Sequence, residues 1–581
     1  MQTIFDFIKT AQNDYQSHYI TLNDGLEHNQ KKTINLIDLY YNSTFESGKT
    51  DAQGQEKPFF NINRNRVHLA VRATDDGGEI RIAPKRGRSD RRLQALLLNA
   101  RDAEWRDDTE FDAFRRKLRY IRAKYGGVVV KRIKENGTIV VKTVDWSNLI
   151  TDQQDLLNNP IIERHLYNPS DIMGMNWDNK EDAIALAKKN NAAQASNDAT
   201  VDNQTIGSFV EVYEVSGVVP TILYDPEKGN DTTFDRYKFI VVMDKSDKDA
   251  NKGIILYKGK QKENPYDYIP WIEVSGRALG LGIVEMLFEP QVWTNWTKMA
   301  ERDLLNIARL MLFDSTGDSV NTDNVFSDVF TGHVFKKAGL TQINTTPSAI
   351  PSLETFLAAW ENLSDKEASS FDAITGEDVN ASDPYKKTKL LNYVAGSEFK
   401  YRRKEERDFI RRIYKKWVLP DHLSKVDTRK EMEAVLSDDE IEFVDSALVA
   451  KKAHSAFAET LGDITKSPAQ VGDVAQRDSE MLARSGKSRK ITNITKDVFP
   501  DDILTDLDVV VGTENDGDAK LALLERFFQA FSPALLNQQA MQNPTVSTLL
   551  EQASEQAGLN VNSAKQLSAS PVAAETATSN V

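Results

Sequence analysis

Two kinds of hydrophobic spacing divide the first half of the chain. Apolar residues recur every three or four positions over 1–46 and 89–124, which predicts amphipathic helices. Over 127–144, β-branched residues flank an Asn-Gly pair at 136–137, which accepts the positive φ angles of a tight hairpin turn. Further strands are predicted at 209–223, 237–243 and 253–257, with a helix at 181–193. We therefore expect a mixed α+β region from about residue 58 to 275.

The pattern changes after Gly276 and becomes mainly helical as far as Lys416. Pro290 suits the first position of a helix, and apolar residues at helical spacing follow it to Phe313 without another proline or glycine. A polar stretch with a short predicted strand at 332–337 separates this helix from a second one at 352–371. A polar loop comes next. The long helical run that follows, 386–416, holds twelve Lys/Arg against four Asp/Glu.

Composition and charge limit how the protein can meet nucleic acid. With 581 residues, of which 40% are hydrophobic and 28% charged, the chain is a folded one with two or more structural regions. Its net charge of -14 means that any contact with DNA has to come from local basic patches. One such patch is 85–132, with fifteen Lys/Arg against seven Asp/Glu. We interpret it as a solvated helical face, with a phosphate-facing surface as the alternative.

The residues that usually carry catalysis are missing or isolated. There is no cysteine, and none of the seven histidines is spaced to share one helix face with another. Gly-Lys-Thr at 48–50 lacks the leading glycine of a phosphate-binding loop, and Gly-Leu-Gly at 280–282 lacks the third glycine of a dinucleotide site. We therefore expect no enzyme activity, cofactor or metal site. The sequence also lacks a signal-peptide pattern and a membrane-spanning apolar run, so we expect no membrane partner.

The order of the elements after Asn264 resembles the portal proteins of tailed bacteriophages. In both, a helix leads to a small α/β excursion, a returning helix, a loop of Ile-Thr-Gly type (here 374–376) and a long amphipathic helix. Gly282, Gln291 and Asn295 are similar to a Gly, Gln and Asn pattern of that family. The resemblance covers roughly residues 30 to 420 and depends on architecture and loose signatures.

This resemblance implies a mainly α fold with an α+β wing region and a wing, stem, clip and crown architecture. The implied regions are a wing of N-terminal helices plus an α+β region (1–289), stem helix 1 (290–313), a clip (314–352), stem helix 2 (353–373), a tunnel loop (374–387), a long wing helix (388–420), a helical crown-like region (421–567) and a disordered tail (568–581).

The resemblance also implies a function and a set of partners. Portal proteins form a homo-oligomeric ring, usually of twelve subunits, at one capsid vertex of the virion, after synthesis in the bacterial cytoplasm. The ring is a channel for double-stranded DNA in packaging and ejection. It contacts the major capsid protein, the terminase large subunit and head–tail adaptor or tail proteins. The implied DNA-facing candidates are Thr375, Gly376, Lys386, Lys387 and Lys389, and the implied docking candidates in the clip are Asp314, Asp318, His333, Lys336 and Lys337.

Two alternatives remain open at the level of sequence. The chain could be another head–tail connector or a scaffold-like virion protein, because a long helix with an apolar stripe is common to many folds. It could also be a hydrolase that uses carboxylates brought together by the fold. Acidic clusters such as 438–440 are more often surface charge, and no second catalytic partner accompanies them.

Overall fold

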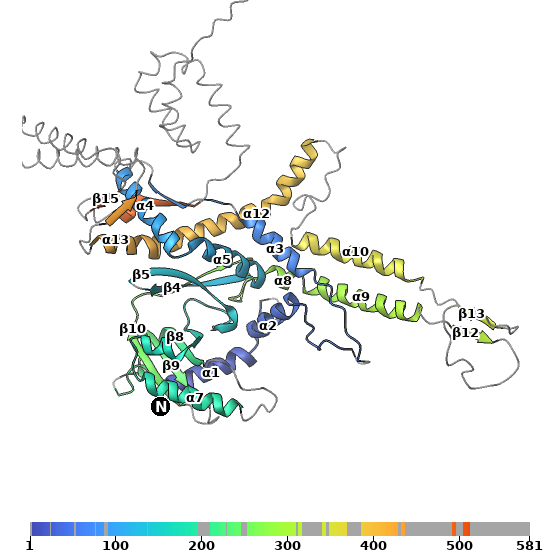
Figure 1. Cartoon of the computed structure of the whole chain (residues 1–581), viewed down its shortest axis with the longest axis horizontal. Helices are drawn as coiled ribbons and strands as arrows, with labels where there is room; N and C mark the ends of the chain where they lie inside the picture. The colour runs from blue at the N-terminus through green and yellow to red at the C-terminus, as the bar shows by residue number, and fades with distance from the viewer. Residues whose placement is uncertain are drawn as a thin grey trace, which may run out of the picture. The chain divides into compact units, whose positions relative to one another are not determined.

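The computed structural model of this chain describes most of the first 427 residues and short segments beyond them (Figure 1). The described residues are 3–23, 25–51, 54–75, 77–78, 80–85, 91–135, 137–195, 209–227, 229–245, 252–308, 312–315, 340–343, 348–368, 385–427, 432–435, 491–494 and 503–511. The chain divides into two compact units, 1–75 with 82–509 and 76–81 with 510–581. All the geometry below concerns the first unit.

The chain begins with a capped helix, α1 (Ile4–Ser17). The Thr3 N–H donates to the Asp6 carboxylate at 2.8 Å, and the Thr3 hydroxyl accepts from the Asp6 N–H at 3.2 Å, which satisfies two amides at the helix start. Short strands β1 (Ile20–Thr21) and β2 (Glu27–His28) and helix α2 (Gln30–Tyr41) follow. The helical pattern predicted over 1–46 is thus confirmed, apart from the small hairpin inside it.

A five-stranded antiparallel sheet in the order β10-β9-β8-β7-β6 is covered on both faces. Its strands are β6 (Leu149–Ile150), β7 (Ile161–Tyr167), β8 (Val210–Pro220), β9 (Phe234–Met243) and β10 (Gly253–Lys260). Ile4 and Ile8 of α1 pack with Tyr213 on one face. Helices α6 (Pro169–Gly174) and α7 (Lys180–Ala195) pack with Val212 on the other. The predicted strands and the predicted 181–193 helix are confirmed.

The predicted hairpin consists of β4 (Gly127–Glu135) and β5 (Thr138–Val144), and β11 (Tyr266–Pro270) adds a third strand beside β4. Gly126, just before β4, has φ +91° and crosses a second backbone segment. A Cβ on Gly126 would lie 2.2 Å from the carbonyl oxygen of Gly280, so the two segments can cross this closely only without a side chain.

The remaining elements of the first half are mostly helical. They are α3 (Asn63–Thr74), β3 (Ile80–Pro84), α4 (Arg92–Asp108), α5 (Phe111–Tyr125), α8 (Ile283–Met286) and the 3₁₀ turns Trp146–Asn148 and Thr221–Leu223. A helical core joins α2, α3, α5 and α8, with Ile37, Val67, Ala123 and Leu287 among its buried members. Phe399 belongs to the same core and is the contribution of α12.

After α8 the chain forms two paired helices and a long third one. They are α9 (Phe288–Ala308), α10 (Ile350–Glu367) and α12 (Tyr385–Ile413), with the antiparallel strands β12 (Leu312–Ser315) and β13 (Leu340–Ile343) between α9 and α10. The observed ends of these helices differ from the predicted ones. The helix predicted to reach 313 ends at Ala308, because 312–315 pairs as a strand with 340–343. The strand predicted at 332–337 lies outside the described residues.

The long helix also begins earlier than predicted. The residue pattern predicted it from 386 and the portal resemblance implied a start at 388, whereas α12 starts at Tyr385. Lys386 and Lys387, expected in a loop, therefore lie in the first turn of α12. A π-helical turn at Tyr414–Val418 joins α12 to α13 (Leu419–Asp427).

Past residue 427 the described segments differ from the helical expectation for 421–567. They are the strands β14 (Met432–Val435), β15 (Ile491–Ile494) and β16 (Leu507–Val511) and the single-turn helix α16 (Ile503–Asp506). β14 pairs antiparallel with β15, so residues some 60 positions apart supply each other's backbone hydrogen bonds. The tail predicted to be disordered, 568–581, lies outside the described residues. Among the described helices, none is both long enough and apolar enough to cross a membrane.

Candidate functional site

Helices α9 and α10 lie side by side as an antiparallel hairpin (Figure 1). Aromatic rings join them: Trp293 of α9 stacks on Trp360 of α10, with centroids 6.0 Å apart and planes 11° apart. Phe356 meets both rings edge-on, with centroids 6.1 and 6.0 Å away. Stacked and edge-on aromatic pairs each add about 0.5–1.5 kcal/mol to the burial of their surface. These contacts hold the hairpin together along its own length.

Two buried amides fix the beginning of α9 to the chain before α3. The Gln291 Oε1 accepts from the Ile62 N–H at 3.0 Å and from the Asn63 Nδ2 at 3.1 Å, while its Nε2 donates to the Phe60 carbonyl at 2.7 Å. The Asn295 Oδ1 accepts from the Phe60 N–H at 3.0 Å. Gln291 and Asn295, singled out in the sequence, therefore set the direction in which the hairpin leaves the body of the protein.

Three large apolar side chains of α9 are exposed. Trp296 is 50% exposed, Leu305 47% and Val292 46%, and all three belong to the same helix. Single exposed apolar residues are ordinary. Val292 and Trp296 are one turn apart and share a side of α9, whereas Leu305 lies on the opposite side of the helix.

The basic segment 85–132 is only in part the solvated face that its composition suggested: Arg116 and Lys117 are exposed, but several other cations are buried. Arg119 is 4% exposed, and its Nε donates to both oxygens of the buried Glu406, each at 3.0 Å. Arg122 is 1% exposed, its terminal nitrogen lies 2.6 Å from Glu405, and burial lowers its pKa while Glu405 opposes that effect. The arginines of α5 thus neutralise acids of α12. The paired residues are about 285 positions apart in the chain, so no local sequence pattern predicts the pairing.

The structure does not show whether the predicted site residues lie close to one another. Lys386, Lys387 and Lys389 lie in the first turns of α12, and Asp314 lies in β12, but their side chains are not among those described. The others lie outside the described residues: Thr375, Gly376, Asp318, His333, Lys336 and Lys337.

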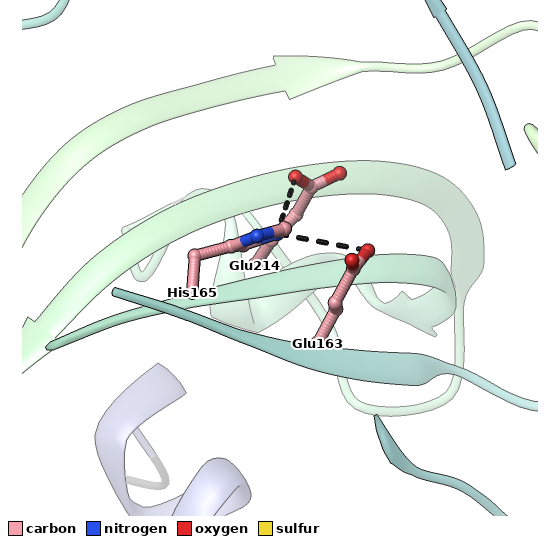
Figure 2. Close-up of side chains that lie close together, drawn as sticks. All are labelled: Glu163, His165 and Glu214. Atoms are coloured by element: carbon pink, nitrogen blue, oxygen red, sulfur yellow. Dashed lines mark ion pairs between the residues drawn. The ribbon is translucent and has the colours of Figure 1, made fainter. Parts of the chain in front are cut away.

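A cluster of charged side chains that was not predicted lies on the five-stranded sheet. Glu163 and His165 point to the same face of β7, and Glu214 stands opposite Glu163 on β8 (Figure 2). The His165 Nε2 lies 3.6 Å from Glu163 and 3.5 Å from Glu214. That Glu163 and His165, two positions apart, would share a face of a strand could be read from the sequence. The register that adds Glu214 could not, because it depends on the pairing of Glu163 with a residue 51 positions further along the chain.

The three ligand groups of this cluster lie within 4.8 Å of one another, which is close enough to hold a cation. The positive charge at this cluster comes, however, from lysines of the chain itself. The Lys131 ammonium lies 2.6 Å from Glu163 and 2.9 Å from Glu214, and Lys238 lies 2.9 Å from Glu214. Burial opposes ionisation of Glu214, but Lys131, His165 and Lys238 together hold its pKa well below the usual range. We conclude that these groups form a charge-balanced network that braces the sheet.

No known protein family matches the chain, and no curated protein matches its sequence. Among solved structures, the chain is similar to a chain from the neck of an empty GTA (gene transfer agent) particle computed with C6 symmetry. The TM-score is 0.30 and the identity 9%, over 62% of this chain and 75% of the other. A likeness of this size supports no functional conclusion, so the proposal that follows depends on this chain's own residues.

Proposed function

We propose that this chain is a subunit of a portal ring in a tailed-phage virion, located at one capsid vertex. The observation that carries the proposal is the order and pairing of four parts: α9, the β12–β13 pair, the returning α10 and the long α12. One helix that leaves the body, a pair of short strands and a second helix that returns beside the first suit a stem with a clip at its end. A long helix after a further connection suits the wing.

The same parts suggest distinct roles within such a ring. In the proposal the α9–α10 hairpin lines the channel for double-stranded DNA, and β12–β13 with its connections docks the terminase and, later, adaptor or tail proteins. Lys386, Lys387 and Lys389 at the start of α12 face the DNA near the tunnel loop, and the wing meets the capsid protein. The exposed Trp296 and Leu305 on α9 favour close packing of many copies side by side.

We further propose that the ring is a passive conduit. A net charge of -14 suits a channel wall, because phosphates held by many lysines and arginines would slide slowly. The packaging force would come from a separate ATPase. The charged groups of the Glu163, Glu214 and Lys131 network are paired with each other, which fits a bracing role.

Electron microscopy of the purified full-length chain tests the proposal. We expect rings with a central hole wide enough for a duplex and a narrow stem, with a native mass that is a multiple of one chain, usually twelve. Monomers at all concentrations would contradict the proposal. Rings without a stem would favour a different head–tail connector. Magnesium-dependent hydrolysis of DNA by the same sample would favour the hydrolase alternative.

A further inference from the structure

Most acids of α12 are paired with arginines. Glu406 is buried against Arg119, Glu405 lies 2.6 Å from Arg122, and Glu398 bonds to Arg402 of the same helix. Three of the four carboxylates in the 386–416 run are therefore paired with arginines, and one of them, Glu406, is buried. The fourth, Asp408, is exposed. The positive charge that these pairs leave unbalanced lies on the outer face of α12, which also carries Asp408 one turn after Lys404.

Three cations of that outer face have no carboxylate partner among the residues that the structure describes. They are Arg403, Lys404 and Arg407, which occupy two adjacent turns of α12; Lys404 is exposed and the two arginines are half-buried. The Arg403 Nε donates to the Phe399 carbonyl at 3.4 Å, a long bond that leaves its terminal nitrogens unused. Further along, Arg411 and Lys415 differ, because both pair with Asp508.

A fourth cation comes from another helix. Arg72 is exposed in the last turn of α3 and has no side-chain partner in the described part of the chain. Arg119 places this helix end: it lies 2.8 Å from Asp75, which follows α3, and 3.0 Å from Glu406 of α12. The last turn of α3 therefore lies beside the turn of α12 that carries Arg403, Lys404 and Arg407.

We propose that Arg72, Arg403, Lys404 and Arg407 form a basic face that binds the phosphate backbone of double-stranded DNA. Arginine presents a planar fork of donors that matches two phosphate oxygens. A protein partner is less well suited, because such interfaces need an apolar centre, whereas DNA interfaces are polar and positively charged. Tyr401, 55% exposed, is the large apolar side chain described on this stretch.

This inference rests on the proposed portal function and adds a second place of contact. The tunnel loop and Lys386, Lys387 and Lys389 belong to the beginning of α12, whereas the basic face lies about four turns further along the helix. DNA would then be held at two levels of the wing. Because the binding is to phosphate, it should not depend on base sequence.

The test compares two full-length variants with the wild type. The first carries Arg403→Gln, Lys404→Gln and Arg407→Gln. The matched control carries Arg411→Gln, Lys415→Gln and Lys416→Gln, which removes the same charge from cations that are already paired with Asp508 or Asp267. Binding to a short fluorescent duplex is measured by anisotropy between about 50 and 200 mM salt, the range over which phosphate contacts weaken steeply.

We expect the first variant to bind at least tenfold more weakly, with its salt slope reduced by roughly 2.7, or about 0.9 for each lost phosphate contact. The control should stay within about twofold of the wild type. Equal binding by the first variant, an equal loss in the control, or no binding by the wild type overturns the proposal. Loss of rings with DNA binding retained also overturns it, because the face would then join copies. A wild type without rings contradicts the portal function itself, whatever the titration gives.

Discussion

Two lysines opposite each other on one hairpin have very different surroundings. Lys131 of β4 and Lys142 of β5 are cross-strand partners and so point to the same face. The side chain of Lys131 is 7% exposed and held by Glu163 and Glu214, whereas that of Lys142 is 54% exposed and pairs with Glu135 at 2.5 Å. Two lysines that face each other across a hairpin thus differ: the charge of Lys131 is buried among acids, and that of Lys142 is exposed to solvent.

This contrast predicts unequal costs of removing an acid. Glu214→Gln should lower the free energy of unfolding by about 3–5 kcal/mol, because it leaves buried ammonium groups with too few partners. Glu135→Gln, on the exposed pair, should change it by less than about 1 kcal/mol. Urea unfolding followed by tryptophan fluorescence measures both. Equal effects would mean that the Glu214 network is not part of what stabilises the sheet.

The lowered pKa of Glu214 adds a pH dependence with a definite sign. Since its folded-state pKa lies well below the usual 4.5, the ionised carboxylate stabilises the fold fully above that pH, and the contribution is lost as pH falls through the folded-state value. Wild-type stability should therefore drop below about pH 4.5 more steeply than that of Glu214→Gln. Parallel pH profiles for the two proteins would contradict this assignment.

At the scale of elements, the crossing of two backbones at Gly126 is the tightest constraint. Gly126→Ala should destabilise the protein by more than about 4 kcal/mol or prevent folding, because the new Cβ meets the Gly280 oxygen at 2.2 Å. Gly137, in the β4–β5 turn, is the matched control. It also has positive φ, +81°, but nothing lies within 4 Å of its Cβ position, so Gly137→Ala should cost about 1–2 kcal/mol. Similar costs at both positions, measured by thermal unfolding, would argue against the crossing.

These two glycines also mark how far the sequence could predict the fold. The turn at Gly137 was predictable, because its signal is contained in two adjacent residues and their β-branched flanks. The crossing at Gly126 was not, because its partner is 154 residues away. The helices within 1–46 and 181–193 and the strands within 209–257 were predicted for the same local reason, whereas α3 and β7 were not predicted. The burial of Arg119 and the direction of α9 were missed, since both depend on distant residues such as Glu406 and Asn63.

For the molecule as a whole, the exposed apolar side chains of α9 should matter for assembly more than for folding. If the portal proposal holds, Trp296→Gln with Leu305→Gln should shift rings toward monomers while leaving the unfolding free energy within about 1 kcal/mol of the wild type. Light scattering measures the shift. Leu166→Gln, which changes a side chain of similar exposure (56%) on β7, is the control and should leave rings intact. An equal loss of rings in the control would show that the effect is not specific to α9.

The π-helical turn at Tyr414–Val418 has a consequence for how the length of this chain can vary. A π turn takes up one residue more than an α turn over the same stretch, so deleting one residue there would let the α-helix continue with its following face unchanged. The same deletion at Lys404 would rotate everything after it by about 100°, moving the buried Trp417 toward solvent. A one-residue gap in related chains should therefore fall within 414–418.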